Sequence, residues 1–316
     1  MAALAALLAS LPAAVFLSLL FEGIDRKLHA RMQGRIGPPV TQPFYDFAKL
    51  LNKESVFPSS SSKAIFASAP VIAAASSILA GAIPLASLVA GTSVVGDLIL
   101  ILYLLTMSSI MVMIGGSSSG NPYGAIGFSR KMVMLIGYEV PLLASILPLS
   151  LKSQHSFSYH GIVQSQVGMG TCFAFAYPSS AFAAAAFLAC IPAAAGVVPF
   201  DVPEAKTEIV HGYLVEYGGP HLALARLAKD AASFALSFLA LTLFFYHPPL
   251  FEGHASLGGL ASAILCVAFA PAMMFLTVTV PRTVFARLKV GQAFKFCWSL
   301  PLTLSALSVV LSAAGF

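Results

Sequence analysis

The chain has 316 residues, of which 58% are hydrophobic and only 9% are charged, and its net charge at neutral pH is +5. Soluble domains carry about 25% charged residues, so this composition excludes an ordinary soluble protein and indicates an integral membrane protein. The four cysteines are far apart, with no CxxC pair and no histidine at ligand spacing. We therefore expect the cysteines to be small apolar side chains packed within helices. We also expect that this chain alone holds no catalytic residue, metal site or cofactor.

Eight apolar segments have about the 20 residues that a helix needs to cross a bilayer. They lie near 2–21, 66–90, 94–115, 132–151, 173–199, 231–247, 257–280 and 296–315. The sequence thus predicts an all-α polytopic membrane protein, with a single integral membrane domain over 1–316. The predicted loops of one side lie at about 22–65, 116–131, 200–230 and 281–295. The first segment has no Lys or Arg before it and no evident cleavage site, so we expect it to be a retained helix.

The basic residues predict the orientation of these helices in the membrane. If both termini lie outside, 16 of the 17 Lys and Arg residues fall in cytoplasmic loops, and only Lys152 lies on the outer side. Cytoplasmic loops are enriched in Lys and Arg, so we expect this orientation in the cell membrane. The outer loops are short and nearly uncharged, which indicates no outer ligand-binding domain.

The first predicted loop contains an amphipathic segment after a Gly- and Pro-rich turn. Phe44, Phe47, Ala48 and Leu51 follow the i, i+3, i+4, i+7 spacing of one helix face, which predicts a surface helix along the membrane. Its charges have two interpretations, namely lipid anchoring with the positive-inside bias, or a docking surface for a soluble partner. The residues expected at such an interface are Arg26, Arg31, Arg35, Gln42, Asp46, Lys49 and Lys53.

The stretch PFDVPEAKTEIVHGYLVEYGGP at 199–220, in the predicted loop at 200–230, holds four of the twelve acidic residues of the chain. Asp201 and Glu204 have the spacing of a capping box, and Glu204, Glu208 and His211 would share one helix face. Two carboxylates one turn apart repel each other, so we expect one to hold a proton or to meet a basic partner such as Arg31 or Arg35. The segment is either a capped surface helix with solvated acids or a proton-handling site, and this second hypothesis also includes Glu216.

Two acidic residues fall within predicted spans. Glu139 lies just before Pro141, and a charge at the bilayer centre costs roughly 2.5–3.5 kcal/mol, so we expect this carboxyl to be neutral or paired and able to relay protons. Asp97 lies near the outer end of its span, where an interfacial position is the simpler interpretation.

Four stretches together resemble the NADH dehydrogenase subunit 1 (H-subunit) family, which anchors the membrane arm of respiratory complex I to its peripheral arm. They are DRKLHARMQGRIGPPVTQPFYDFAKLLNKE at 25–54, YEVP at 138–141, PFDVPEAKTEIVHGYLVEYGG at 199–219 and VGQAFKFCWSLPL at 290–302. They occur in the order of that family and span essentially the whole chain.

Departures from the family pattern point to one of its branches. Only "PVT" separates the GP and QP pairs of the first loop, and the stretch at 96–131 is similar to that of energy-converting [NiFe]-hydrogenases, including formate hydrogenlyase. Relatives often carry an acid or Ala at the position of His211, and they often carry a Ser at the position of Gly218. The resemblance favours the hydrogenase branch over quinone-reducing complex I.

The resemblance implies a membrane anchor that couples electron transfer to proton or Na⁺ translocation. Its expected partners are hydrogenase-like large and small subunits, a ferredoxin-like iron–sulfur subunit and antiporter-like membrane subunits, which would hold the iron–sulfur clusters and a [NiFe] centre. The alternatives are the quinone-site subunit of complex I, a stand-alone secondary transporter and a passive scaffold. A transporter would favour inverted repeats, and no convincing repeat is present.

Overall fold

The computed structural model describes residues 2–93, 98–153, 155–246 and 255–315, and these form helices and connecting loops. The longer helices are α1 (Ala2–Met32), α3 (Lys63–Ala90), α4 (Leu98–Ser117), α5 (Pro122–Ala144), α9 (Pro178–Ala194), α11 (Gly219–Phe244), α12 (Ala255–Met274) and α14 (Val290–Ala313). The shorter ones are α2 (Gln42–Leu51), α6 (Leu147–Lys152), α7 (Tyr159–Met169), α8 (Phe173–Ala176), α10 (Lys206–Ile209), α13 (Val280–Val284), the 3-10 helices η1 (Val202–Glu204) and η2 (Gly212–Leu214), and the π-helix η3 (Phe275–Thr279). Asp97 lies outside the described residues.

The predicted all-α polytopic architecture is confirmed. Among the described residues, seven helices are long and apolar enough to cross a membrane, and α9 is a shorter apolar helix of 17 residues. Together they follow the order of the eight predicted segments. The segment expected at 173–199 is divided into α8 and α9, because Tyr177 has an extended backbone and Pro178 begins the second helix.

Several predicted loops are shorter than expected, because helices continue into charged sequence. The first helix does not end near 21 but at Met32, α5 begins at Pro122, and α11 begins at Gly219. These extensions carry Lys and Arg side chains that the sequence assigned to loops. Three of these seven side chains form ion pairs with other parts of the chain, as described below: Arg26, Arg130 and Lys229.

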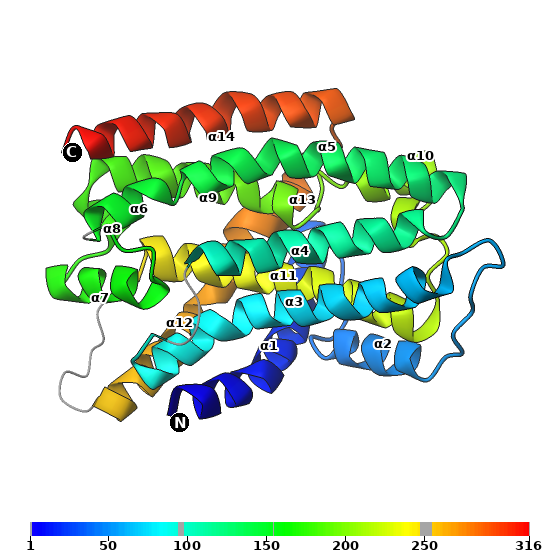
Figure 1. The fold of residues 1–316 in the computed structure, drawn as a ribbon, viewed down its shortest axis with the longest axis horizontal. Helices are drawn as coiled ribbons and strands as arrows, with labels where there is room; N and C mark the ends of the chain where they lie inside the picture. The colour runs from blue at the N-terminus through cyan, green and yellow to red at the C-terminus, as the bar shows by residue number, and fades with distance from the viewer. Residues whose placement is uncertain (1, 94–97, 154, 247–254, 316) are drawn as a thin grey trace.

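The bundle is built around α3 and α11 (Figure 1). In its apolar window α11 is 83% buried by other helices, whereas α1 and α14 are 28% buried. The mean hydropathy of α11, 1.5, is nevertheless the lowest among the seven spans. A helix that faces protein on most sides depends on close packing more than on high hydrophobicity. The many Ala and Ser residues of α11 allow such close packing.

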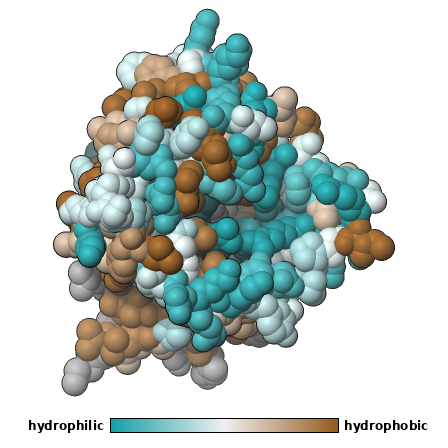
Figure 2. Space-filling model, turned by 90° about the vertical axis from the view of Figure 1, so that its right-hand side faces the viewer, coloured by the Kyte–Doolittle hydropathy of each residue, from teal (hydrophilic) through white to brown (hydrophobic). Residues whose placement is uncertain are grey.

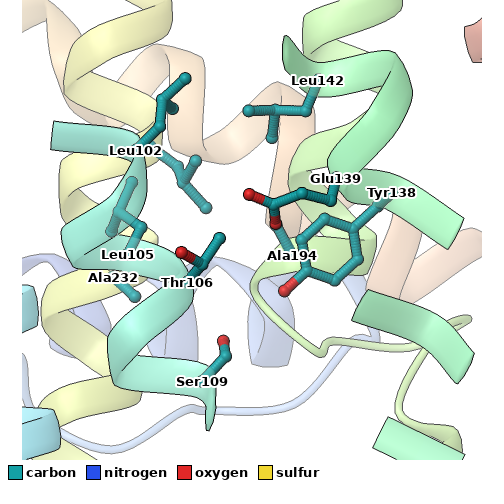
Figure 3. Close-up of a pocket in the computed structure, with 10 residues that line it drawn as sticks. Leu102, Leu105, Thr106, Ser109, Tyr138, Glu139, Leu142, Ala194 and Ala232 are labelled. Atoms are coloured by element: carbon teal, nitrogen blue, oxygen red, sulfur yellow. The ribbon is translucent and has the colours of Figure 1, made fainter. Parts of the chain in front are cut away.

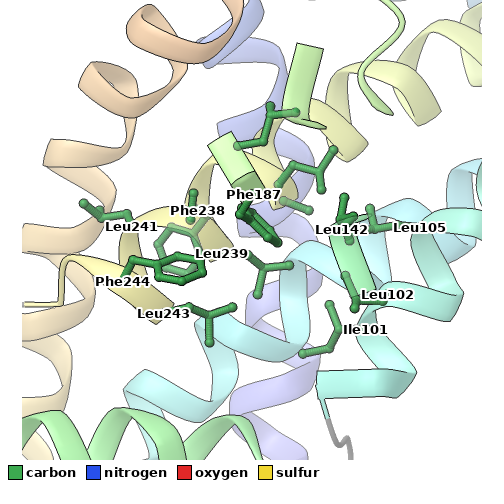
Figure 4. Close-up of a cluster of buried hydrophobic side chains, with 14 of the residues drawn as sticks. Ile101, Leu102, Leu105, Leu142, Phe187, Phe238, Leu239, Leu241, Leu243 and Phe244 are labelled. Carbon is green, nitrogen blue, oxygen red and sulfur yellow. The ribbon is translucent and has the colours of Figure 1, made fainter. Parts of the chain in front are cut away.

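The main apolar core lies where α4, α5, α9 and α11 meet (Figure 4). Phe187 of α9 and Phe244 of α11 are fully buried, with ring centroids 5.5 Å apart. Phe234 contacts both Phe238 of its own helix and Phe21 of α1. Aromatic contacts of this kind add to the free energy gained from apolar burial, and here they fix α11 against its neighbours.

The predicted surface helix is present as α2, and its inward face differs slightly from the expected one. Pro43 is buried, and Phe44 and Phe47 are half-buried, whereas Ala48 and Leu51 are exposed. Phe44 packs against Phe16 of α1 with ring centroids 5.3 Å apart.

The two ends of the bundle differ in polarity. The chain termini both lie at one end, and α2, α10 and the start of α5 lie at the other (Figure 1). Viewed onto that second end, hydrophilic residues cover much of the surface (Figure 2). We call it the charged end, and it contains the loops between α1 and α2, α2 and α3, α4 and α5, and α9 and α11.

Candidate functional site

The acidic loop between α9 and α11 does not form the single helix that the sequence predicted. It is divided into η1, α10 and η2, because Ala205 leaves the helical region and Val210 and Gly212 have positive φ angles of 61° and 56°. Glu204, Glu208 and His211 therefore do not share a helix face. The capping box expected from Asp201 is also absent, since its side chain caps nothing.

Glu204 lies at the centre of the loop, and its side chain is only 16% exposed. Its Oε2 accepts a hydrogen bond from Lys229 Nζ of α11 at 2.7 Å, and Tyr213 of η2 donates its hydroxyl to Oε1. Burial alone would raise the pKa of Glu204, but the charge of Lys229 and the two hydrogen bonds outweigh it and hold this pKa below its usual range. Burial and the negative charge of Glu204 raise the pKa of Tyr213, so its hydroxyl stays protonated.

The other acids of the loop bind different parts of the bundle. Arg287, between α13 and α14, donates to Asp201 Oδ2 at 2.8 Å. Arg130 of α5 pairs with Glu208, and Asn121, before α5, donates to Glu216 at 2.5 Å. The prediction that Arg31 or Arg35 pairs with these acids is wrong. Each carboxylate instead ties the loop to a neighbouring helix or helix end.

His211 lies half-buried beside η2. Burial lowers its pKa, and the nearby Lys206 lowers it further, so the ring is neutral at physiological pH. The side chain of His211 forms no hydrogen bond with any described residue, including Glu204 and Glu208.

Glu139 lies on α5 at a small cavity within the bundle that is lined mainly by Leu and Ala (Figure 3). The cavity has a volume of about 20 Å³, which is large enough for a single water molecule. Its walls come from α4, α5, α9 and α11 and include Thr106, Ser109 and Tyr138. An acid in an otherwise apolar span thus has polar neighbours and space for water, as a proton relay requires.

The cavity and the acidic loop are neighbours. Tyr138, next to Glu139 on α5, interacts electrostatically with Tyr213, and Tyr213 donates to Glu204. Tyr138 and Tyr213 are both buried, but no hydrogen bond among the described side chains joins Tyr138 to Glu139 or to Tyr213.

A second group of charges joins α1, α2 and α11. Arg26 binds Glu22 at 2.7 Å and Asp46 at 2.9 Å, and Gln42 donates to Asp46 at 3.0 Å. Burial would raise the pKa of Asp46, but these hydrogen bonds from Gln42 and Arg26 hold it below the usual range. Asp230, next to Lys229 on α11, interacts electrostatically with Glu22 and Arg26. This group therefore meets the Glu204–Lys229 pair on α11.

The residues predicted for a partner interface fall into two sets. Arg26, Gln42 and Asp46 bind one another within the chain. The side chains of the second set are exposed at the charged end: Arg31, Arg35, Lys49 and Lys53. Ile36, which follows Arg35, is fully exposed at the tip of the α1–α2 loop.

Sequence reasoning missed several charged residues of the site. Asp25 is 1% exposed, with Arg282 at 2.7 Å and a hydrogen bond from Thr279 of η3. The sequence assigned Asp25 to a loop and did not identify Asp230 or Lys229 as part of the site. A predicted helix start at Gly219 would have placed Lys229 and Asp230 inside a spanning helix, where charged residues indicate function. Among the described residues, no group of three His, Cys, Asp or Glu side chains can hold a metal ion.

The comparisons with known proteins now decide the family. The family model described as NADH dehydrogenase matches residues 4–313.

The chain belongs to the NADH dehydrogenase subunit 1 (H-subunit) family. The H-subunit of the NADH-quinone oxidoreductase of Geobacillus kaustophilus is 32% identical over 97% of this chain and 92% of its own length. Hydrogenase-4 component C of Escherichia coli is 32% identical over 73% of this chain and 71% of its own length. A chain in the structure of the membrane-bound sulfane sulfur reductase, an archaeal respiratory membrane complex, superimposes with a TM-score of 0.87 at 30% identity, covering 99% of this chain and 100% of that one. Members of the family thus serve as subunits of multi-subunit membrane complexes.

Proposed function

We propose that this chain is the membrane anchor and coupling subunit of an ion-translocating redox complex. The observation that carries the proposal is the series of buried and half-buried polar residues from Glu139 through Tyr138 and Tyr213 to Glu204 and Lys229. Charge that arrives near the acidic loop can change the protonation of these groups, because their interactions act in a low-dielectric interior. Glu139 would carry the change into the membrane, towards partner subunits.

The redox arm of such a complex would dock on the charged end. Arg31, Arg35, Lys49 and Lys53 are exposed there, and charged surfaces of this kind steer and orient a partner more than they add affinity. Arg26, Gln42 and Asp46 support this surface from within by holding α2 against α1. Iron–sulfur clusters and a [NiFe] centre would belong to the partners. The positive-inside bias supports an orientation with the charged end in the cytoplasm and both termini outside.

Within the family we favour the energy-converting hydrogenase branch. The similarity to hydrogenase-4 component C and the short "PVT" stretch of the first loop support it. The alternative is the quinone-site subunit of a respiratory NADH:quinone oxidoreductase, which the match of the Geobacillus kaustophilus protein to 97% of this chain supports. Metal analysis of the native complex separates them, since nickel is expected in the first case and bound quinone without nickel in the second.

Glu139→Gln tests the coupling itself. In the native complex reconstituted into vesicles, we expect roughly a tenfold or larger loss of ions moved per electron, because glutamine cannot carry a proton. Glu54→Gln, at an exposed position of the α2–α3 loop, is the control and should match the wild type. Full ion translocation by an assembled Glu139→Gln complex would contradict the proposal and favour a passive scaffold.

A further inference from the structure

Lys131 is a buried lysine that the proposed function has not used. It lies on α5, two turns before Glu139, and is only 7% exposed. Among the described residues, no hydrogen bond and no ion pair within 4 Å involves its Nζ atom. An ammonium group with so little exposure and no such partner is unfavourable, because burial removes most of its hydration.

The environment of Lys131 contains a second lysine and only one carboxylate. A Cβ atom placed on Gly196 would lie 3.7 Å from Nζ of Lys131 and 3.9 Å from Nζ of Lys229, so the two amines face the same small space. Lys229 donates to the carbonyl of Gly196 at 3.0 Å and to Glu204 at 2.7 Å. Lys229, and not Lys131, therefore binds the carbonyl oxygen of Gly196 and the carboxylate oxygen of Glu204.

The other elements packed against this part of α5 add no second carboxylate for Lys131. From η1 comes Glu204, from η2 the hydroxyl of Tyr213, and from α11 Lys229. Glu208 of α10 pairs with Arg130, and Lys295 of α14 is exposed. With Glu204 ionised and Lys229 charged, the pair is neutral, and a proton on Lys131 would leave the cluster with an unbalanced positive charge.

We propose that Lys131 exchanges a proton beside the Glu204–Lys229 pair. It takes up one proton from water at the charged end when negative charge increases nearby, and releases it afterwards. The step converts –NH₂ and one proton to –NH₃⁺ and moves no electron through this chain. A lysine suits this role because its protonation changes readily on burial, whereas an arginine stays charged. This inference rests on the proposed coupling function and names a further residue that carries it.

The test compares Lys131→Arg with Lys131→Met in the native complex. We expect both to lose ion translocation per electron by roughly tenfold, since neither side chain exchanges a proton near neutral pH. Proton uptake on reduction, followed with a pH indicator, should be smaller in both variants than in the wild type between about pH 6 and pH 9. Lys295→Met is the control and should leave both quantities unchanged.

The two variants separate proton exchange from a structural role. Arginine keeps the positive charge, so wild-type translocation and proton uptake in Lys131→Arg would overturn the inference. Lys131→Gln provides a smaller polar replacement if the methionine variant does not assemble with its partners, and it is expected to show the same losses. If Glu139→Gln abolishes translocation while Lys131→Arg retains it, the coupling function is supported and only the proposed role of Lys131 is contradicted. If Glu139→Gln retains translocation, the coupling function and the role of Lys131 are both contradicted.

Discussion

Two carboxylates within the bundle, those of Glu204 and Asp25, each have more than one partner. Glu204 has Lys229 and the hydroxyl of Tyr213, and Asp25 has Arg282 and the hydroxyl of Thr279. Removing two ions from water costs several kcal/mol, and a single contact rarely compensates unless further hydrogen bonds satisfy the remaining atoms. The additional hydroxyl donors explain how charged side chains persist in helices that cross the membrane.

The pKa of Glu204 predicts how stability depends on pH. Because this pKa is lower in the folded state than in the unfolded chain, the ionised carboxylate stabilises the fold above the ordinary pKa of Glu, about 4.3, and the contribution is lost as pH falls through the folded value. We expect Glu204→Gln to destabilise the protein by about 3 kcal/mol at pH 7 and by much less near pH 3. Thermal unfolding midpoints at both pH values check this, with Glu54→Gln as the exposed control. An equal difference at both pH values would be inconsistent with ionisation as the source.

At the scale of elements, close backbone contact places the acidic loop on α4 and α5. A Cβ atom on Gly116 would lie 2.4 Å from the carbonyl oxygen of Tyr213, and one on Gly127 would lie 2.6 Å from its amide nitrogen. No larger residue fits at either position without moving η2. These two glycines therefore set the position of Tyr213 between Tyr138 and Glu204.

Gly127→Ala is expected to displace η2 and to cost about 1–3 kcal/mol, as overpacking in a filled interior does. Gly291→Ala in α14 is the matched control, because nothing lies within 4 Å of the added methyl group, and alanine favours a helix by roughly 0.5–1 kcal/mol. Thermal unfolding and ion translocation of both variants provide the measurement. If Gly127→Ala behaves like Gly291→Ala in both assays, close packing does not position the loop.

At the scale of the whole molecule, hydrophilic residues cover much of the charged end (Figure 2). The helices that face outward, α1 and α14, expose large apolar side chains such as Leu8, Phe16, Trp298 and Val310. The central helix α11 instead carries Lys229, which pairs with Glu204 of η1. The molecule thus places polar groups where protein or water can satisfy them and presents hydrocarbon to the lipid.

The orientation can be tested by labelling cysteines from each side of the membrane. With half-buried Cys172 replaced by Ser, we expect His155→Cys to react with a membrane-impermeant maleimide in intact cells and Ser59→Cys to react only in inside-out vesicles. Cys190, Cys266 and Cys297 are buried, so the background should be low. Reaction of Ser59→Cys in intact cells would place the charged end outside.

The sequence by itself determined the apolar spans, the surface helix α2 and the family, because hydrophobic length, helical periodicity and motif order are properties of neighbouring residues. Only the tertiary structure decided where helices end in charged sequence and which charges meet. Asp25 pairs with Arg282 across more than 250 residues, and Glu204 meets Lys229 instead of the arginines of the first loop. Local patterns carry no information on such partners, and a charge inside a helix is stable only if a distant residue satisfies it.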